Sequence, residues 1–148
     1  IEQHDPNQLL QTLRAAGIRV KRDPPVTSLG QMEMIQLVYE PPETYIDLQI
    51  DLFLAKSRYH DEALRRRVPM QLENLDVEIA VLACEDLILH KLQAGRIIDR
   101  ADAAALLRAN RAALDMGYLM RWVRDLELKA EFTEIWGEAF PGESVPVQ

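Results

Sequence analysis

The spacing of apolar residues changes once along this chain of 148 residues, and the change restricts the folds that it can adopt. Up to about residue 82, apolar and polar side chains alternate over several short stretches, a pattern typical of half-buried strands. From Cys84 to Ala139 the apolar residues follow helical spacing, which predicts helices over residues 85–93, 99–110, 117–126 and 128–139. Strands that come mostly first and helices that come last indicate an α+β fold, with a small, largely antiparallel or mixed sheet followed by a helical bundle.

Caps and turns place the shorter elements of the first half. Asp5-Pro6 is a favourable N-cap and first helical position, so a helix is predicted from there to Gly17. A short helix capped by Ser57 is predicted next, before two strands around a turn at Glu73-Asn74. Between the two helices we predict, in chain order, a strand, a loop and two strands joined as a hairpin by Pro-Pro-Glu, over residues 18–22, 23–31, 32–40 and 44–55.

These elements suggest three parts of the chain. We expect a sheet-containing core over residues 1–82, a helical part over 83–140 and a flexible tail over 141–148. The chain begins at Ile1 and runs almost at once into a helix, so we expect either that an N-terminal piece was removed or that the sequence is part of a longer product.

Composition and charge weigh against several classes of protein. No apolar run approaches the roughly 20 residues of a membrane span, and no signal peptide opens the chain, so no membrane partner is expected. The net charge of -7 weighs against binding of duplex DNA, which relies on clustered Lys and Arg. The cationic run Arg65 to Arg67 is interpreted as a solvated helix end, with a local basic patch as the alternative. A single cysteine, Cys84, leaves no internal disulfide and fits a reducing cytoplasm.

Short motifs add further exclusions. The sequence has no GxSxG, Walker or GxGxxG motif, so a serine hydrolase, a P-loop NTPase and a Rossmann dehydrogenase are unsupported. His4 and His60 lack metal-ligand spacing and form no credible zinc site with Cys84. We predict His90 at the surface. The tryptophans of the chain are predicted to belong to the core, at positions Trp122 and Trp136.

The strand predicted over residues 44–55 carries two carboxylates on one face. Its apolar side chains at every second position, from Ile46 to Leu54, are expected to point into the core. Asp47 and Asp51 then lie together on the other face, beside Gln49. That face could simply meet water, but aspartate is unfavourable in strands and carboxylate oxygens are ligands that Mg²⁺ prefers, so a metal site is the alternative.

A lysine in an apolar helical arc is the other unusual feature. Lys91 falls between Leu87 and Ile88 at helical spacing, where its ammonium must reach water or find an anion. Asp99 and Asp102 are the expected partners, because Gln-Ala-Gly-Arg is just long enough to turn the chain and return the next helix. Two interpretations stay open: a structural ion pair between packed helices, or a cluster facing a cleft that receives an anionic ligand such as a nucleotide phosphate.

Three stretches of the sequence carry a resemblance to a known family. They are YIDLQIDLFLAKSRYHDEAL, VLACEDLILHKLQAGRIIDRADAAALL and LDMGYLMRWVRDLEL. They resemble the minimal nucleotidyltransferases related to the AbiEii abortive-infection toxins, over most of the chain from Leu9 to about Leu128. The most specific part is the series of Glu-Asp-Leu, Lys-Leu, Ala, Arg, Asp and Asp within residues 85–102.

The resemblance implies a fold of the DNA-polymerase-beta type, with a mixed sheet flanked by helices and a C-terminal helical bundle. It also implies Mg²⁺-dependent transfer of a nucleotidyl group from an NTP to an acceptor, which in toxins can be RNA, and a cognate antitoxin protein as a partner. Asp51 matches the third metal-binding carboxylate, with Asp47 as a substitute, and Lys91 matches the lysine near the nucleotide phosphates. The following family positions fall on Arg96, Asp99 and Asp102, where the two acids would orient Lys91 or an acceptor.

The sequence departs from the family at its start. The family's Gly-Ser turn and Asp-x-Asp strand stand before the first helix, so two of three metal-binding carboxylates are expected from an N-terminal segment or a partner chain. Cys84 stands where relatives often carry proline. Two functional hypotheses follow: an AbiEii-like nucleotidyltransferase, or a catalytically inactive binding or regulatory module of the same fold. The sequence does not specify the NTP, the acceptor or the oligomeric state.

Overall fold

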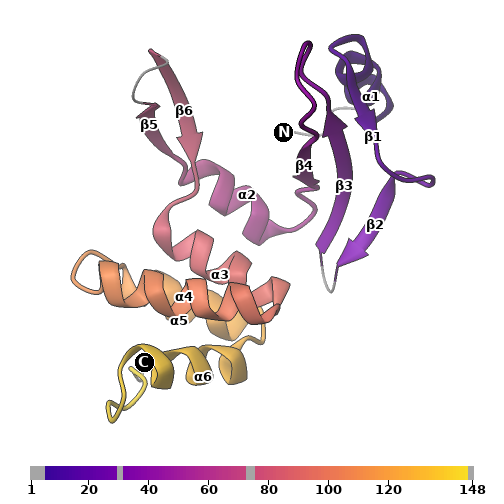
Figure 1. Ribbon diagram of the computed structural model, residues 1–148. Helices are drawn as coiled ribbons and strands as arrows, with labels where there is room; N and C mark the ends of the chain where they lie inside the picture. Colours follow the sequence, from indigo (N-terminus) through magenta and orange to yellow (C-terminus); the bar gives the residue numbers. More distant parts are fainter. Residues whose placement is uncertain (1–5, 30–31, 73–75, 147–148) are drawn as a thin grey trace. The chain divides into compact units, whose positions relative to one another are not determined.

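The chain is an α+β protein. The computed structural model describes residues 6–29, 32–72 and 76–146, which contain six helices and six strands (Figure 1). They form two compact units, residues 1–56 and 57–148. The expected boundary lay between residues 82 and 83. The observed boundary comes earlier because helix α2 (Arg58–Arg65) contributes Tyr59 and Ala63 to the core of the helical unit.

The first unit is a four-stranded sheet with one helix. Helix α1 (Pro6–Ala15) is followed by strands β1 (Ile18–Val20), β2 (Val26–Leu29), β3 (Met32–Tyr39) and β4 (Leu48–Phe53). Strand β3 is central: β1 and β2 share one of its edges, and β4 pairs along the other (Figure 1). All strand pairs among the described residues are antiparallel, so the mixed sheet that the resemblance implied is not observed in this part of the chain.

The core of the first unit lies where α1 meets the sheet. Leu10 of α1 packs with Ile35 and Leu37 of β3, and Leu52 and Leu54 contribute from the end of β4. The predicted loop over residues 23–31 contains β2, which was missed because its flanking Pro and Gly residues, with Ser28 inside it, indicate a turn. The predicted hairpin of β3 and β4 is confirmed.

The second unit is mostly helical. Helix α2 leads into the antiparallel hairpin of β5 (Val68–Leu72) and β6 (Val77–Val81). Helices α3 (Cys84–Ala94), α4 (Ile97–Asn110), α5 (Met116–Asp125) and α6 (Lys129–Ala139) follow, as the spacing predicts. Ile88, Leu107 and Phe132 are fully buried in the core that α2 to α6 share, and Trp122 and Trp136 are buried there too, as predicted.

The ends of the elements agree with the expected caps in two places. The Ser57 hydroxyl accepts a hydrogen bond from the His60 backbone N–H at 3.3 Å, which confirms it as the N-cap of α2. Gly17 follows α1 with φ +79°. The predicted cap Asp5 and the predicted turn Glu73-Asn74 lie outside the described residues.

The C-terminal segment is anchored as far as residue 146, where a flexible tail was expected. Val145 packs against the helical core, and Arg111 forms two hydrogen bonds to the Glu143 carboxylate at 2.9 and 2.6 Å. Among the described residues, no helix has the length and apolar content needed to cross a membrane.

Candidate functional site

Lys91 lies between two carboxylates of the next helix, as the sequence predicts. Its Nζ donates to Asp99 Oδ1 at 3.1 Å and to Asp102 Oδ2 at 2.7 Å. The Lys91 side chain is 25% exposed and that of Asp99 only 1%, so the pair sits at the margin of the core. The hydrogen bond that Lys91 donates to Asp102, with a second donated to Asp99, raises the pKa of Lys91 despite partial burial, so the ammonium stays charged.

Arg96 is the second cation of this group. Its Nε and Nη2 donate to the two oxygens of Asp99 at 2.6 and 3.2 Å, while its side chain remains 63% exposed. These hydrogen bonds, together with the one from Lys91, hold the pKa of Asp99 below its ordinary value although burial opposes the shift. We call Lys91, Arg96, Asp99 and Asp102 the lysine cluster.

The turn between α3 and α4 assembles the lysine cluster. Gly95 ends α3 in the left-handed region, with φ +67°, and its N–H donates to the Lys91 carbonyl at 3.2 Å. Arg96 then has extended backbone before α4 begins at Ile97. Lys91 is therefore in the last turn of one helix and Asp99 in the first turn of the next, and each charge interacts favourably with the dipole of its helix.

The other two predicted site residues belong to the first unit. Asp51, in β4, is exposed and accepts hydrogen bonds from Gln36 Nε2 at 3.3 Å and Gln49 Nε2 at 3.2 Å. Asp47 precedes the strand and is exposed as well. No group of three or more His, Cys, Asp or Glu residues within residues 6–29, 32–72 and 76–146 is placed to hold a metal ion. The described residues thus offer single carboxylates to Mg²⁺ and not a complete set of ligands.

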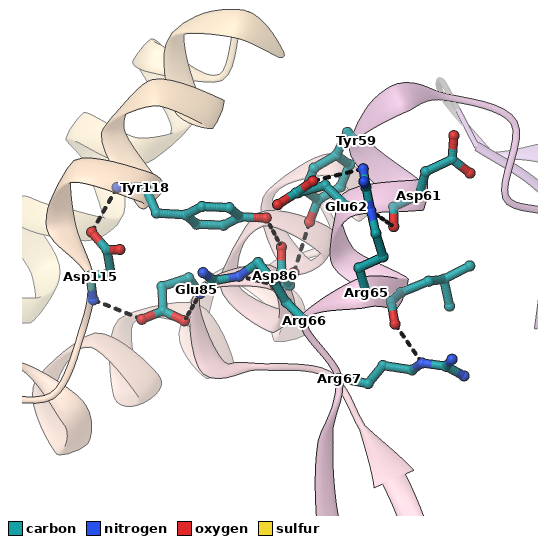
Figure 2. Close-up of polar contacts among 11 residues, drawn as sticks. Tyr59, Asp61, Glu62, Arg65, Arg66, Arg67, Glu85, Asp86, Asp115 and Tyr118 are labelled. Carbon is teal, nitrogen blue, oxygen red and sulfur yellow. Dashed lines mark hydrogen bonds and ion pairs between the residues drawn. The ribbon is translucent and has the colours of Figure 1, made fainter.

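A second polar network, which we call the arginine network, joins α2, α3 and α5 and was not predicted (Figure 2). Arg66, at the C-cap of α2, donates to Glu85 Oε2 at 3.0 Å and to Asp86 Oδ2 at 3.2 Å. Tyr118 donates to Asp86 Oδ1 at 2.6 Å, and its ring lies 3.7 Å beneath the Arg66 guanidinium carbon. The interpretation of residues 65–67 as a solvated helix end is therefore wrong for Arg66, whose partners lie 19 and 20 residues further along the chain.

Burial sets the electrostatics of the arginine network. Asp86 is fully buried, and its burial raises its pKa even though Tyr118 and Arg66 donate to it. The Tyr59 hydroxyl donates to the Asp86 carbonyl at 3.1 Å, and burial raises the pKa of this phenol as well. Glu85 Oε1 accepts the Asp115 N–H at 2.7 Å. Each carboxylate oxygen of this network has a donor, and Asp86 is fully buried, so the network ties three helices together and keeps Asp86 out of reach of a ligand.

His90 was predicted at the surface, but its side chain is only partly exposed. Its ring packs against Tyr59, with 5.4 Å between centroids, and stacks on His60 at 5.5 Å. Burial, aided by the charge of His60, lowers the pKa of His90 to about 4. The pKa of His60 is lowered by burial too, although Asp61 opposes the shift. Both imidazoles are therefore neutral near neutral pH.

The chain has no match among protein-family models, curated proteins or solved structures. The class of the protein therefore depends on the fold and on the side chains described above.

Proposed function

We propose that this chain is part of an AbiEii-like nucleotidyltransferase, in which Lys91 and Arg96 bind the phosphates of an NTP. The observation that carries the proposal is the position of two cations at the turn between α3 and α4, with Arg96 largely exposed and Lys91 partly exposed. A guanidinium and an ammonium side by side suit a polyphosphate, because one binds two oxygens in a fork and the other acts as a point charge. The net charge of -7 disfavours a nucleic-acid duplex as the ligand of these two cations.

The lysine cluster has the chemistry that phosphate binding needs. Asp99 is buried and ionised, so it fixes both cations before a ligand arrives. Lys91 and Arg96 would then offset the negative charge that builds on the pyrophosphate during transfer, while Asp102 orients the ammonium or the acceptor. Preorganised charges of this kind stabilise a transition state without a reorganisation cost.

The metal is the part of the proposal for which this chain offers least. Bound Mg²⁺ would stabilise the attacking and leaving oxygens, and Asp51 would be one ligand, with Asp47 as its substitute. Two further carboxylates are required from a preceding segment or a partner chain, so transfer is expected only where they are supplied. A nucleotidyl acceptor such as RNA, a cognate antitoxin and a cytoplasmic location belong to the same proposal.

A second function has a specific observation in its favour. The Lys91 ammonium already has two carboxylate partners at hydrogen-bonding distance, which is the arrangement of a structural ion pair between helices. In that case the chain is a catalytically inactive binding or regulatory module of the same fold. The two functions differ in one respect that can be measured, namely whether the lysine cluster binds a nucleotide.

Calorimetric titration with a non-hydrolysable ATP analogue in Mg²⁺ buffer tests the proposal, with GTP, CTP and UTP analogues in parallel. We expect Arg96→Ala to weaken binding by about tenfold or more, since it removes a charge-assisted contact to phosphate. Arg124→Ala is the matched control: Arg124 is 68% exposed and paired with Asp125, but belongs to α5.

Lys91→Met keeps the length of the apolar stem, and it should abolish binding while the helical circular dichroism is retained. Binding that is equal in the Arg96→Ala, Lys91→Met and Arg124→Ala variants would refute phosphate contact at the lysine cluster. If none of the four analogues binds the unmodified chain, the inactive module is the better account.

A further inference from the structure

We propose that the outer edge of β4 is a docking site for one β-strand of a protein partner, a strand in which aliphatic and basic side chains alternate. The proposal concerns the first unit alone and does not rest on phosphate binding at the lysine cluster, although Asp51 cannot hold Mg²⁺ while a basic strand is docked beside it. Strand β4 is at the margin of the sheet, and among the described residues it pairs only with β3 (Figure 1).

The register determines which backbone groups of β4 face outward. The Leu54 N–H donates to the Glu33 carbonyl at 2.9 Å, so Leu54 and every second residue before it direct their backbone groups toward β3. On the opposite side of β3, the Gln36 carbonyl accepts the Lys21 N–H at 2.8 Å, and Gln36 is therefore a non-hydrogen-bonded partner of Asp51. Accordingly, the outer edge presents three residues, each with an N–H and a C=O directed away from β3: Gln49, Asp51 and Phe53.

The apolar face of β4 is also incompletely covered. Leu48 and Ile50 lie on the same face as the buried Leu37, yet they remain 47% and 39% exposed. Leu52, by contrast, packs against the core that α1 forms with β3. Leu48 and Ile50 are thus apolar side chains that the core of this unit leaves exposed. An added strand would cover them while its backbone pairs with β4.

Strand β4 has only one of the usual protections of a sheet edge, the charge of Asp51. Natural edge strands avoid association through charged side chains, proline, bulges or very short length. Residues 48–53 are Leu-Gln-Ile-Asp-Leu-Phe, six residues in continuous register with β3 and without a proline or a lysine. The geometry is that of a strand that can accept a neighbour, which is the known mode of β-strand addition.

Charge identifies the kind of strand. Asp51 is exposed on the face opposite Leu48 and Ile50, with the exposed Asp47 just before the strand, so an incoming strand meets carboxylate on one face and aliphatic groups on the other. Two copies of the chain could pair their β4 strands in three antiparallel registers centred near Gln49 to Asp51. In two of these registers an aspartate lies opposite an aspartate, which is unfavourable. A second copy of the chain is therefore a poorer occupant than a strand with lysine or arginine at alternate positions.

Fluorescence anisotropy with short labelled peptides tests the proposal on the full chain. The probe is a peptide of alternating lysine and valine, and its control alternates glutamate and valine. We expect the lysine peptide to bind about tenfold more tightly, because of the carboxylates. Gln49→Pro removes one outward N–H without touching the ladder to β3, and should weaken binding about five- to tenfold, whereas Gln49→Ala keeps the N–H and should change it by less than about twofold.

A charge reversal provides a second test should the proline variant unfold. Asp51→Lys should weaken the lysine peptide and strengthen the glutamate peptide, while circular dichroism reports that the sheet is retained. Equal binding of the two peptides to the unmodified chain, or binding of neither, would overturn the proposal. Dimers in sedimentation equilibrium that Gln49→Pro dissociates and Gln49→Ala does not would overturn it as well, by assigning the edge to a second copy.

Discussion

Lowering the pH from about 7 to about 5 should destabilise the second unit through His90. In the folded chain burial holds the pKa of this imidazole at about 4, whereas the ordinary value is 6.5. A group whose pKa is lowered on folding takes up its proton first in the unfolded state, so stability is lost as the pH falls below about 6.5, until the folded-state pKa is reached. Between pH 6.5 and pH 5 the loss is about 1.4 kcal/mol per pH unit, or about 2 kcal/mol in total.

Urea unfolding followed by tryptophan fluorescence measures this loss. The two tryptophans of the chain, Trp122 and Trp136, are both buried in the second unit, so their emission reports on that unit. His90→Gln removes the titrating group, and the difference between the variant and the unmodified chain isolates its contribution from other groups. We expect this difference to shift by about 2 kcal/mol between the two pH values. If the free energies of unfolding of the two proteins run parallel across this range, the imidazole is not desolvated and the reasoning fails.

Three further substitutions in the second unit can be tested by the same urea assay. Asp99→Asn should cost about 2 kcal/mol near neutral pH, because it leaves two cations without their shared partner. The folded-state pKa of Asp99 is lowered, so its ion pairs contribute fully to stability above about pH 4 and stop contributing as the pH falls through the folded-state pKa. The cost of Asp99→Asn should therefore shrink in acid. A cost that stays constant would contradict the pairing. Tyr118→Phe should cost about 1–2 kcal/mol by removing a donor from buried Asp86, and an unchanged free energy of unfolding would contradict the role of this hydrogen bond. Gly95→Ala should cost about 1 kcal/mol because of its positive φ, and an unchanged midpoint would show that the turn relaxes.

Much of the fold can be predicted from the sequence because its elements have local signals. The α3–α4 turn and the ion pairs of Lys91 follow from spacing over 8 and 11 residues, where helix geometry determines which side chains meet. Strand β2 has no such signal, since the Pro and Gly residues around it and the Ser within it indicate a loop, and only its pairing with β3 makes it a strand.

The arginine network and the partly buried His90 imidazole could not be found in the same way. Arg66 precedes Asp86 by 20 residues and Tyr118 follows Asp86 by 32 residues, so only tertiary packing brings the three side chains together. From the sequence alone, Glu85 and Asp86 could equally be two acids at the start of a helix that interact favourably with its dipole, without any partner such as Arg66. His90 looked exposed because one apolar stripe was assigned to α3, while the helix is covered by α2 as well as by α4 and α5.

The proposed binding of nucleotide phosphate by Lys91 and Arg96 is tested most directly by a crystal structure of the chain with Mg²⁺ and a non-hydrolysable NTP. We predict triphosphate oxygens within hydrogen-bonding distance of Lys91 Nζ and the Arg96 guanidinium, with Asp99 still holding both cations. A nucleotide bound elsewhere, with the lysine cluster unchanged and in contact only with water, would contradict the claim.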